Sequence, residues 1–152
     1  MEDIWNITAL VVSVLSVLLS LYALRQATTK NTSDMYLFFI SQYAKEDMKL
    51  ALRKLKDIKR GVYRLEQWES DMKNNLPKAF EYDEARRLVK YFYDTLAYMK
   101  LEKLIEARFV RLICLKKGAW LYLDTVEAME KFFDSGYDKK PYAVIRDVRS
   151  EE

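Results

Sequence analysis

The N-terminus of the chain contains an apolar segment long enough to cross a lipid bilayer. From Ile4 to Leu24, 21 consecutive residues carry no charge, and twelve of them are Ile, Leu or Val. As a helix this segment extends roughly 31 Å, against a hydrocarbon core of about 30 Å. Trp5 and Tyr22 lie near its two ends, where amphipathic rings favour the membrane interface. We therefore expect residues 1–25 to form one transmembrane anchor.

A cleaved signal peptide or a buried core helix would also contain an apolar run. A signal peptide begins with basic residues and has a shorter apolar stretch, whereas this chain begins Met1-Glu2-Asp3. Length and start together favour a retained anchor. All 26 basic residues lie at or after Arg25, so the positive-inside rule predicts an outside N-terminus and a cytoplasmic C-terminal domain. The predicted location is the cell membrane, with a single pass.

Small side chains recur along one face of this segment at alternating intervals of four and three residues. In lipid, helices associate through close backbone approach and interhelical hydrogen bonds, which small and hydroxylated residues permit. The periodicity therefore predicts a transmembrane association face. The competing interpretation is that each serine hydroxyl only bonds back to its own helix. The predicted face consists of Ala9, Ser13, Ser16, Ser20, Ala23 and Ala27.

The composition argues against catalysis. The chain has no histidine, which removes the commonest general base and metal ligand. Three glycines leave no phosphate-binding loop of the known types. Cys114 lies between Ile113 and Leu115, which favours a small buried hydrophobic residue over a nucleophile. We predict a non-enzymatic protein with no cofactor and no metal site.

The part after the anchor is predicted to be all-α, a bundle of about four to five helices. Polar residues 26–34 are expected to form a juxtamembrane linker, residues 35–136 the bundle and residues 137–152 an extended tail. Apolar periodicity predicts helices from Asp47 to near Gly61, from Asp83 to about Lys100, around Ile105 to Ile113, and from Leu121 to Phe133, with a short helix before Pro77. Asp83 is predicted to cap the long helix, and Gly118 to lie at a helix C-terminus.

Basic residues gather between Lys45 and Arg60, where seven of them stand against three acids. This segment could contact anionic lipid headgroups, nucleic-acid phosphates, or solvent only. The part after the anchor has a net charge of only +5, because 26 basic residues stand against 21 acids, and this argues against nucleic acid. The residues predicted for anionic-lipid contact are Lys49, Arg53, Lys56, Lys59 and Arg60.

Two segments carry a family resemblance: EDMKLALRKLKDI, from Glu46, and DEARRLVKYFYDTL, from Asp83. With the N-terminal apolar run, they resemble an uncharacterised prokaryotic family of short membrane-anchored proteins with a cytoplasmic helical domain, some encoded near phage-defence genes. The likeness covers about residues 35–133. The chain departs from the family pattern by lacking a glycine in the turn after the long helix. The resemblance implies an architecture and no reaction.

The aromatic content is high, with eleven tyrosines, and Tyr91, Phe92 and Tyr93 are consecutive. One helix face cannot bury all three, so some aromatic surface is predicted to be exposed or covered by a partner. Together these features favour a membrane-tethered interaction or scaffold domain, either homo-oligomeric or an accessory subunit of a larger membrane complex. The alternative is a membrane-associated defence or signalling effector that senses nucleic acid or a phage product.

Overall fold

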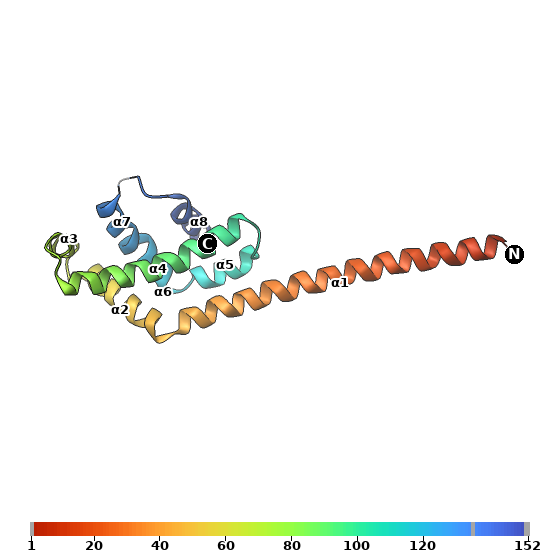
Figure 1. Cartoon of the computed structure of the whole chain (residues 1–152), viewed down its shortest axis with the longest axis horizontal. Helices are drawn as coiled ribbons and strands as arrows, with labels where there is room; N and C mark the ends of the chain where they lie inside the picture. The colour runs from red at the N-terminus through yellow and green to blue at the C-terminus, as the bar shows by residue number, and fades with distance from the viewer. Residues whose placement is uncertain (1, 135, 151–152) are drawn as a thin grey trace. The chain divides into compact units, whose positions relative to one another are not determined.

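The structure is a computed structural model that describes residues 2–134 and 136–150, without the side chains of residues 2–14, 25 and 27–29. In that part of the chain every regular element is helical and no strand is present, which confirms the predicted all-α class. The chain divides into two compact units, Met1–Met35 and Tyr36–Glu152. The elements, in chain order, are α1 (Glu2–Ala44), α2 (Glu46–Lys59), α3 (Leu65–Lys73), α4 (Pro77–Leu101), α5 (Ala107–Cys114), α6 (Lys117–Leu121), a π-helical segment η1 (Tyr122–Val126), α7 (Glu127–Phe133) and α8 (Lys140–Ser150) (Figure 1).

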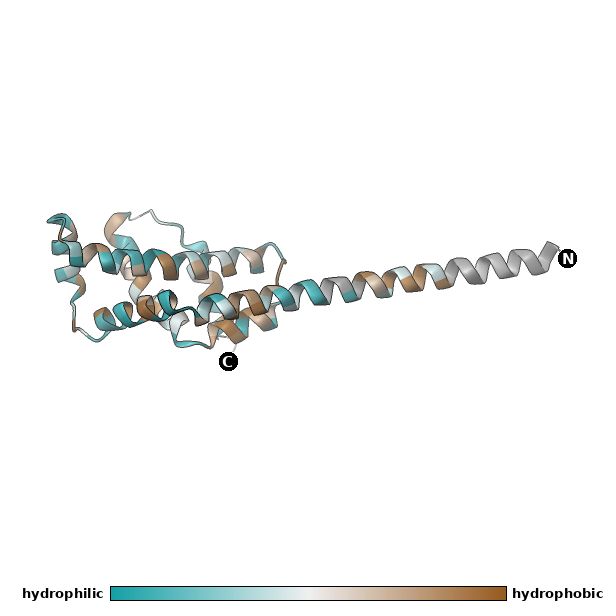
Figure 2. Ribbon diagram, turned by 60° about the horizontal axis from the view of Figure 1, so that its bottom comes forward, coloured by the Kyte–Doolittle hydropathy of each residue, from teal (hydrophilic) through white to brown (hydrophobic). Residues whose placement is uncertain are grey.

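The described residues of the N-terminal unit all belong to α1. Its described large apolar side chains, from Leu15 to Leu24, are 53–68% exposed, and Figure 2 shows this stretch as mainly hydrophobic. The side chains of residues 4–14 of the expected span lie outside the described residues. Within the residues that were described, none of the helices is both long enough and apolar enough to span a bilayer.

The linker expected at residues 26–34 is not a break in the helix. Helix α1 runs through these residues without interruption as far as Ala44. The stretch contains threonine and asparagine, which are poor helix formers, but no glycine or proline. Each poor former costs only a few tenths of a kcal/mol, too little to stop a helix that is already formed on both sides.

Helix α4 is the centre of the bundle, and α2, α3, α5, α8 and η1 all pack on it. Helix α2 shows why the bundle forms: its buried residues recur every three or four positions and its opposite face is exposed. Acids occupy its first turn and lysines its last, in agreement with the helix dipole. The buried residues of α2 are Met48, Ala51, Leu55 and Ile58.

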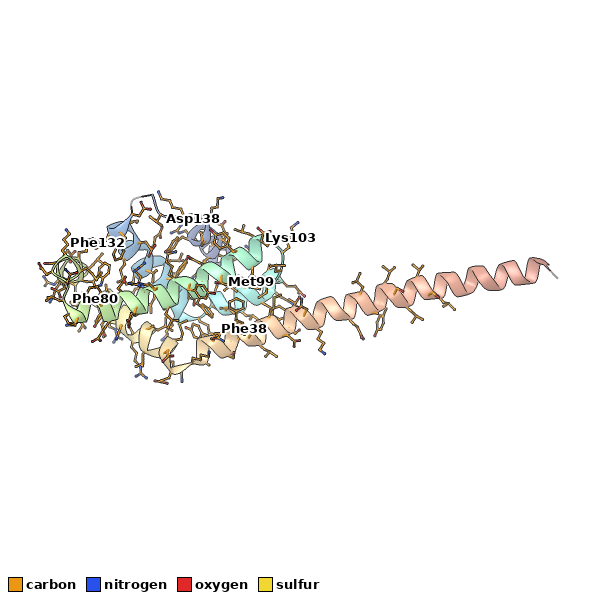
Figure 3. The ribbon with its side chains drawn as sticks, in the orientation of Figure 1. Phe38, Phe80, Met99, Lys103, Phe132 and Asp138 are labelled. Atoms are coloured by element: carbon orange, nitrogen blue, oxygen red, sulfur yellow. The ribbon has the colours of Figure 1, made fainter. Side chains whose placement is uncertain are left out.

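Three helices end with the same left-handed turn. The residue after each C-cap has a positive φ: 74° at Gly61, 54° at Asn75 and 57° at Lys103. After α2, the Gly61 N–H donates to the Ile58 carbonyl and the Val62 N–H to the Asp57 carbonyl, both at 3.0 Å, which satisfies carbonyls that the helix leaves open. The turn predicted after the long helix is therefore present, with Lys103 in the position that usually favours glycine (Figure 3).

Three local predictions were wrong. Helix α4 begins at Pro77, so Asp83 lies inside the helix and does not cap it. Gly118 lies inside α6 and is buried, where the prediction had a helix end. The tail forms α8, which packs on α4 and α5 because its apolar side chains recur every third position. The bundle also has more helices than the expected four to five, since the described residues after Lys103 divide into several short ones.

Aromatic rings fill much of the core. Tyr93, Tyr122 and Tyr142 are fully buried and form a stack with ring centroids 5.1 and 4.4 Å apart. Trp68 is also fully buried, and its indole N–H donates to the Ala79 carbonyl at 3.1 Å. The rings therefore hold α4, η1 and α8 together in one core.

Candidate functional site

The predicted association face is only partly described. The side chains of Ala9, Ser13 and Ala27 lie outside the described residues, whereas Ser16, Ser20 and Ala23 are exposed. The Ser20 hydroxyl donates to the Ser16 carbonyl at 2.8 Å, within the same helix. The competing interpretation, in which each serine hydroxyl bonds only within its own helix, requires this bond. The serine side chain nevertheless stays small, so a second helix can still approach closely at this position.

All five residues predicted for lipid contact are exposed, on α2 or at its C-cap. At 100° per residue, Lys49, Arg53, Lys56 and Arg60 fall on one stripe of the helix, and Lys59 lies to one side. Lys49 pairs with Glu46 at 3.4 Å, and Lys59 pairs with Asp124 of η1. Lys56 and Lys59 also line a hollow beside Trp120, which the other three do not.

Charged side chains inside the bundle are paired with one another. The Asp83 carboxylate accepts from the Arg86 Nε and the Arg87 Nε, each at 2.7 Å, and Arg86 also pairs with Glu130. Asp83 is 1% exposed and Arg86 8%. These charged side chains are part of the fold. Each is already paired with another side chain of the bundle, so none of them is available to bind a ligand.

A second group of paired side chains, partly buried, joins α4 to η1. Lys90 pairs with Asp94 at 2.5 Å, and the Tyr122 hydroxyl donates to the other oxygen of Asp94. Burial and the nearby Asp94 carboxylate raise the pKa of Tyr122 far above its usual range, so this phenol keeps its proton. The protonated Tyr122 hydroxyl can therefore donate its hydrogen bond to the Asp94 carboxylate.

Cys114 is 1% exposed, which confirms its predicted burial. Burial raises the pKa of its thiol to about 12, so the reactive thiolate is scarce near neutral pH. Across the residues that the structure describes, no three His, Cys, Asp or Glu side chains lie where they could hold a metal ion together.

An exposed groove lined by aromatic rings lies between the end of α1, α2 and α4. It encloses about 310 Å³. Tyr91 is 75% exposed and Phe38, labelled in Figure 3, is 57% exposed, whereas Phe92 and Tyr93 are buried. The prediction that one helix face could not bury all three consecutive rings is confirmed. We call this feature the aromatic groove; its apolar lining is Phe38, Phe39, Met48, Leu88, Tyr91 and Phe92.

Sequence periodicity did not find the aromatic groove, because part of its lining comes from α4, which is distant in the chain from the end of α1 and from α2. The one signal was the run of three rings, which required an exposed member. No family model matches the chain, and no curated protein or solved structure matches it either. The resemblance to a prokaryotic membrane-anchored family therefore remains an expectation from sequence.

Proposed function

We propose that this chain is a membrane-anchored, non-enzymatic interaction domain that associates with a second copy of itself, alone or as an accessory subunit of a larger membrane complex. The aromatic groove is the observation that carries this proposal. An exposed aromatic hollow on a small bundle is typical of a surface that a partner covers. In this proposal the segment from Ile4 to Leu24 is the anchor, and the helical domain faces the cytoplasm.

The anchor is supported by the chemistry of the N-terminal unit. Its described apolar side chains from Leu15 to Leu24 are exposed within that unit. A helix that is apolar on every side is stable when lipid or other apolar helices surround it. The uncharged segment is long enough for this, and basic residues follow it on one side only.

A second copy is the favoured occupant of the aromatic groove because the charges on its rim are self-complementary. Lys45 and Asp47 both line the groove and are exposed. Neither forms an ion pair within the described part of the chain. In a two-fold interface each Lys45 meets the Asp47 of its partner, so one surface supplies both signs.

Tyr91→Glu tests the groove. An exposed aromatic anchor at the centre of an interface contributes enough that its loss should weaken association by about 30-fold. We expect the full chain in mild detergent to be dimeric or larger by light scattering, and the variant to be mainly monomeric at the same concentration. Leu112→Glu is the matched control, since Leu112 is 45% exposed on α5 and lies outside the groove. A monomeric native chain without a co-purifying partner would contradict the proposal.

Ser16→Leu combined with Ser20→Leu tests the predicted transmembrane face separately. If the small residues allow two helices to approach closely, the bulky side chains should weaken association roughly tenfold. Val17→Leu, off that face, should leave association unchanged. Self-association would be measured by energy transfer between labelled chains in vesicles. Equal transfer for the double variant and the native chain would favour the interpretation that these serines bond only within their own helix.

A further inference from the structure

One of the tryptophans lies on the surface of the bundle and is not part of its core. Trp120 of α6 is 51% exposed. The Arg149 guanidinium carbon lies 3.9 Å from the ring centroid, and the Lys59 ammonium 5.8 Å from it. Arg149 is held in this place, because its Nη1 donates to the Cys114 carbonyl at 2.6 Å. The indole is therefore fixed by two cations and remains open to the outside.

Trp120 also borders two hollows. The first, of about 440 Å³, has Lys56, Lys59 and Lys117 in its lining. The second, of about 410 Å³, has Arg146 and Arg149. Five cations from α2, α6 and α8 thus line these two hollows together with Trp120, and Asp124 is the one acid in the lining of either hollow. We call Trp120 with Lys56, Lys59, Lys117, Arg146 and Arg149 the Trp120 surface.

The cations of the Trp120 surface are not all neutralised by the protein. Lys59 pairs with Asp124, and Arg146 pairs with Glu127 at 2.9 Å. Lys56 and Lys117 are exposed, and no carboxylate lies within ion-pair distance of either among the described residues. Two free ammonium groups beside a half-exposed indole form a surface that is positive and amphipathic.

We infer that the Trp120 surface binds the phosphate headgroups of anionic phospholipids and holds the helical domain on the membrane. Indole rings partition to the headgroup level of a bilayer, and lysines beside them attract anionic lipid by about fivefold in affinity for each cation. The two features occur here at one place. The inference rests on the proposed function, since an anchored chain keeps the domain within reach of headgroups at high effective concentration.

The surface differs from the one predicted from sequence. Lys56 and Lys59 belong to both, but Lys49 and Arg53 belong to the predicted stripe of α2 alone. Lys117 and the arginines of α8 enter only through the fold. The two surfaces can therefore be separated by substitutions that change the charge equally.

The test uses the full chain with Trp5→Phe, which leaves buried Trp68 and exposed Trp120 as emitters. The protein is reconstituted in vesicles of phosphatidylcholine, with or without about one-quarter phosphatidylglycerol. Quenching by aqueous acrylamide reports the exposure of Trp120. We expect about twofold less quenching and a blue-shifted emission with phosphatidylglycerol, both reversed by about 0.5 M salt.

Lys56→Glu with Lys117→Glu should abolish this protection, while Lys49→Glu with Arg53→Glu should leave it intact. The neutral pair Lys56→Gln with Lys117→Gln should weaken it, and unchanged circular dichroism verifies the fold of each variant. Equal quenching in both vesicle types would overturn the inference, as would equal loss in both charge-reversed pairs. Equal protection by inorganic phosphate or by an oligonucleotide would overturn it in favour of those ligands.

Flotation separates this inference from the proposed function. A chain that floats with pure phosphatidylcholine vesicles supports the anchor, whatever Trp120 does. A chain that fails to float with them contradicts the anchor, and flotation that appears only with phosphatidylglycerol would still support the Trp120 surface. Failure of the proposed anchor and failure of the Trp120 surface therefore give different experimental results.

Discussion

Replacing Asp83 with alanine should lower the free energy of unfolding of the helical domain by about 3–5 kcal/mol, because it leaves a buried cation without its partner. The Asp83 carboxylate is 1% exposed and accepts from Arg86 and Arg87 at 2.7 Å. Arg87 is 66% exposed and can return to water. Arg86 is enclosed, with its guanidinium 4.7 Å from the Phe133 ring, and would keep only Glu130.

Glu81→Ala is the matched control for Asp83→Ala. Glu81 also lies on α4 and pairs with Lys54 at 2.9 Å, but its side chain is 60% exposed. Water screens such a pair, so its loss should cost about 0–1 kcal/mol. Unfolding by guanidinium, followed by the emission of buried Trp68 in a background with Trp5→Phe and Trp120→Phe, measures the stability of both variants. Equal costs for the two variants would show that burial of Asp83 contributes nothing.

The sequence predicted those parts of the fold that depend on neighbours in the chain. Helix α2 has its apolar residues on one stripe and Gly61 just past its end, so periodicity and turn chemistry agreed. The burial of only part of the run from Tyr91 to Tyr93 followed from helix geometry alone. In both cases a few adjacent residues contain the whole physical argument.

Most of the errors arose where distant contacts decide the structure. The error at Asp83 was local: it has the residue type of a cap, but Pro77 starts α4 six residues earlier and Arg86, one turn further on, provides the carboxylate with a partner. Residues 137–152 were predicted to form an extended tail, yet Tyr142 lies in helix α8 and completes an aromatic stack with Tyr122. The Trp120 surface joins α2, α6 and α8, and no local pattern brings these together.

Substitution of Gly118 is the second change with a large expected effect on stability, because side chains that are distant in the chain pack against this glycine. A Cβ at this position would lie 2.7 Å from the Tyr93 hydroxyl oxygen and 3.0 Å from the Tyr43 ring. Neither tyrosine can withdraw freely. Tyr93 is fully buried in the aromatic stack, and the Tyr43 hydroxyl accepts the Gly118 N–H at 3.1 Å. Gly118→Ala should therefore cost about 1–3 kcal/mol of stability through overpacking.

Tyr93→Phe removes the oxygen that the new methyl group would meet, so it should rescue the glycine variant. The Tyr93 hydroxyl is buried without a hydrogen-bond partner in the described structure, and its loss alone should change stability by less than about 1 kcal/mol. In the double variant most of the cost of Gly118→Ala should disappear, leaving the part due to Tyr43. Gly136→Ala, which meets only the side chain of Asp134, is the control and should cost little. Additive costs at Gly118 and Tyr93 in a double-mutant cycle would show that close packing of α6 on α4 is not the reason for this glycine.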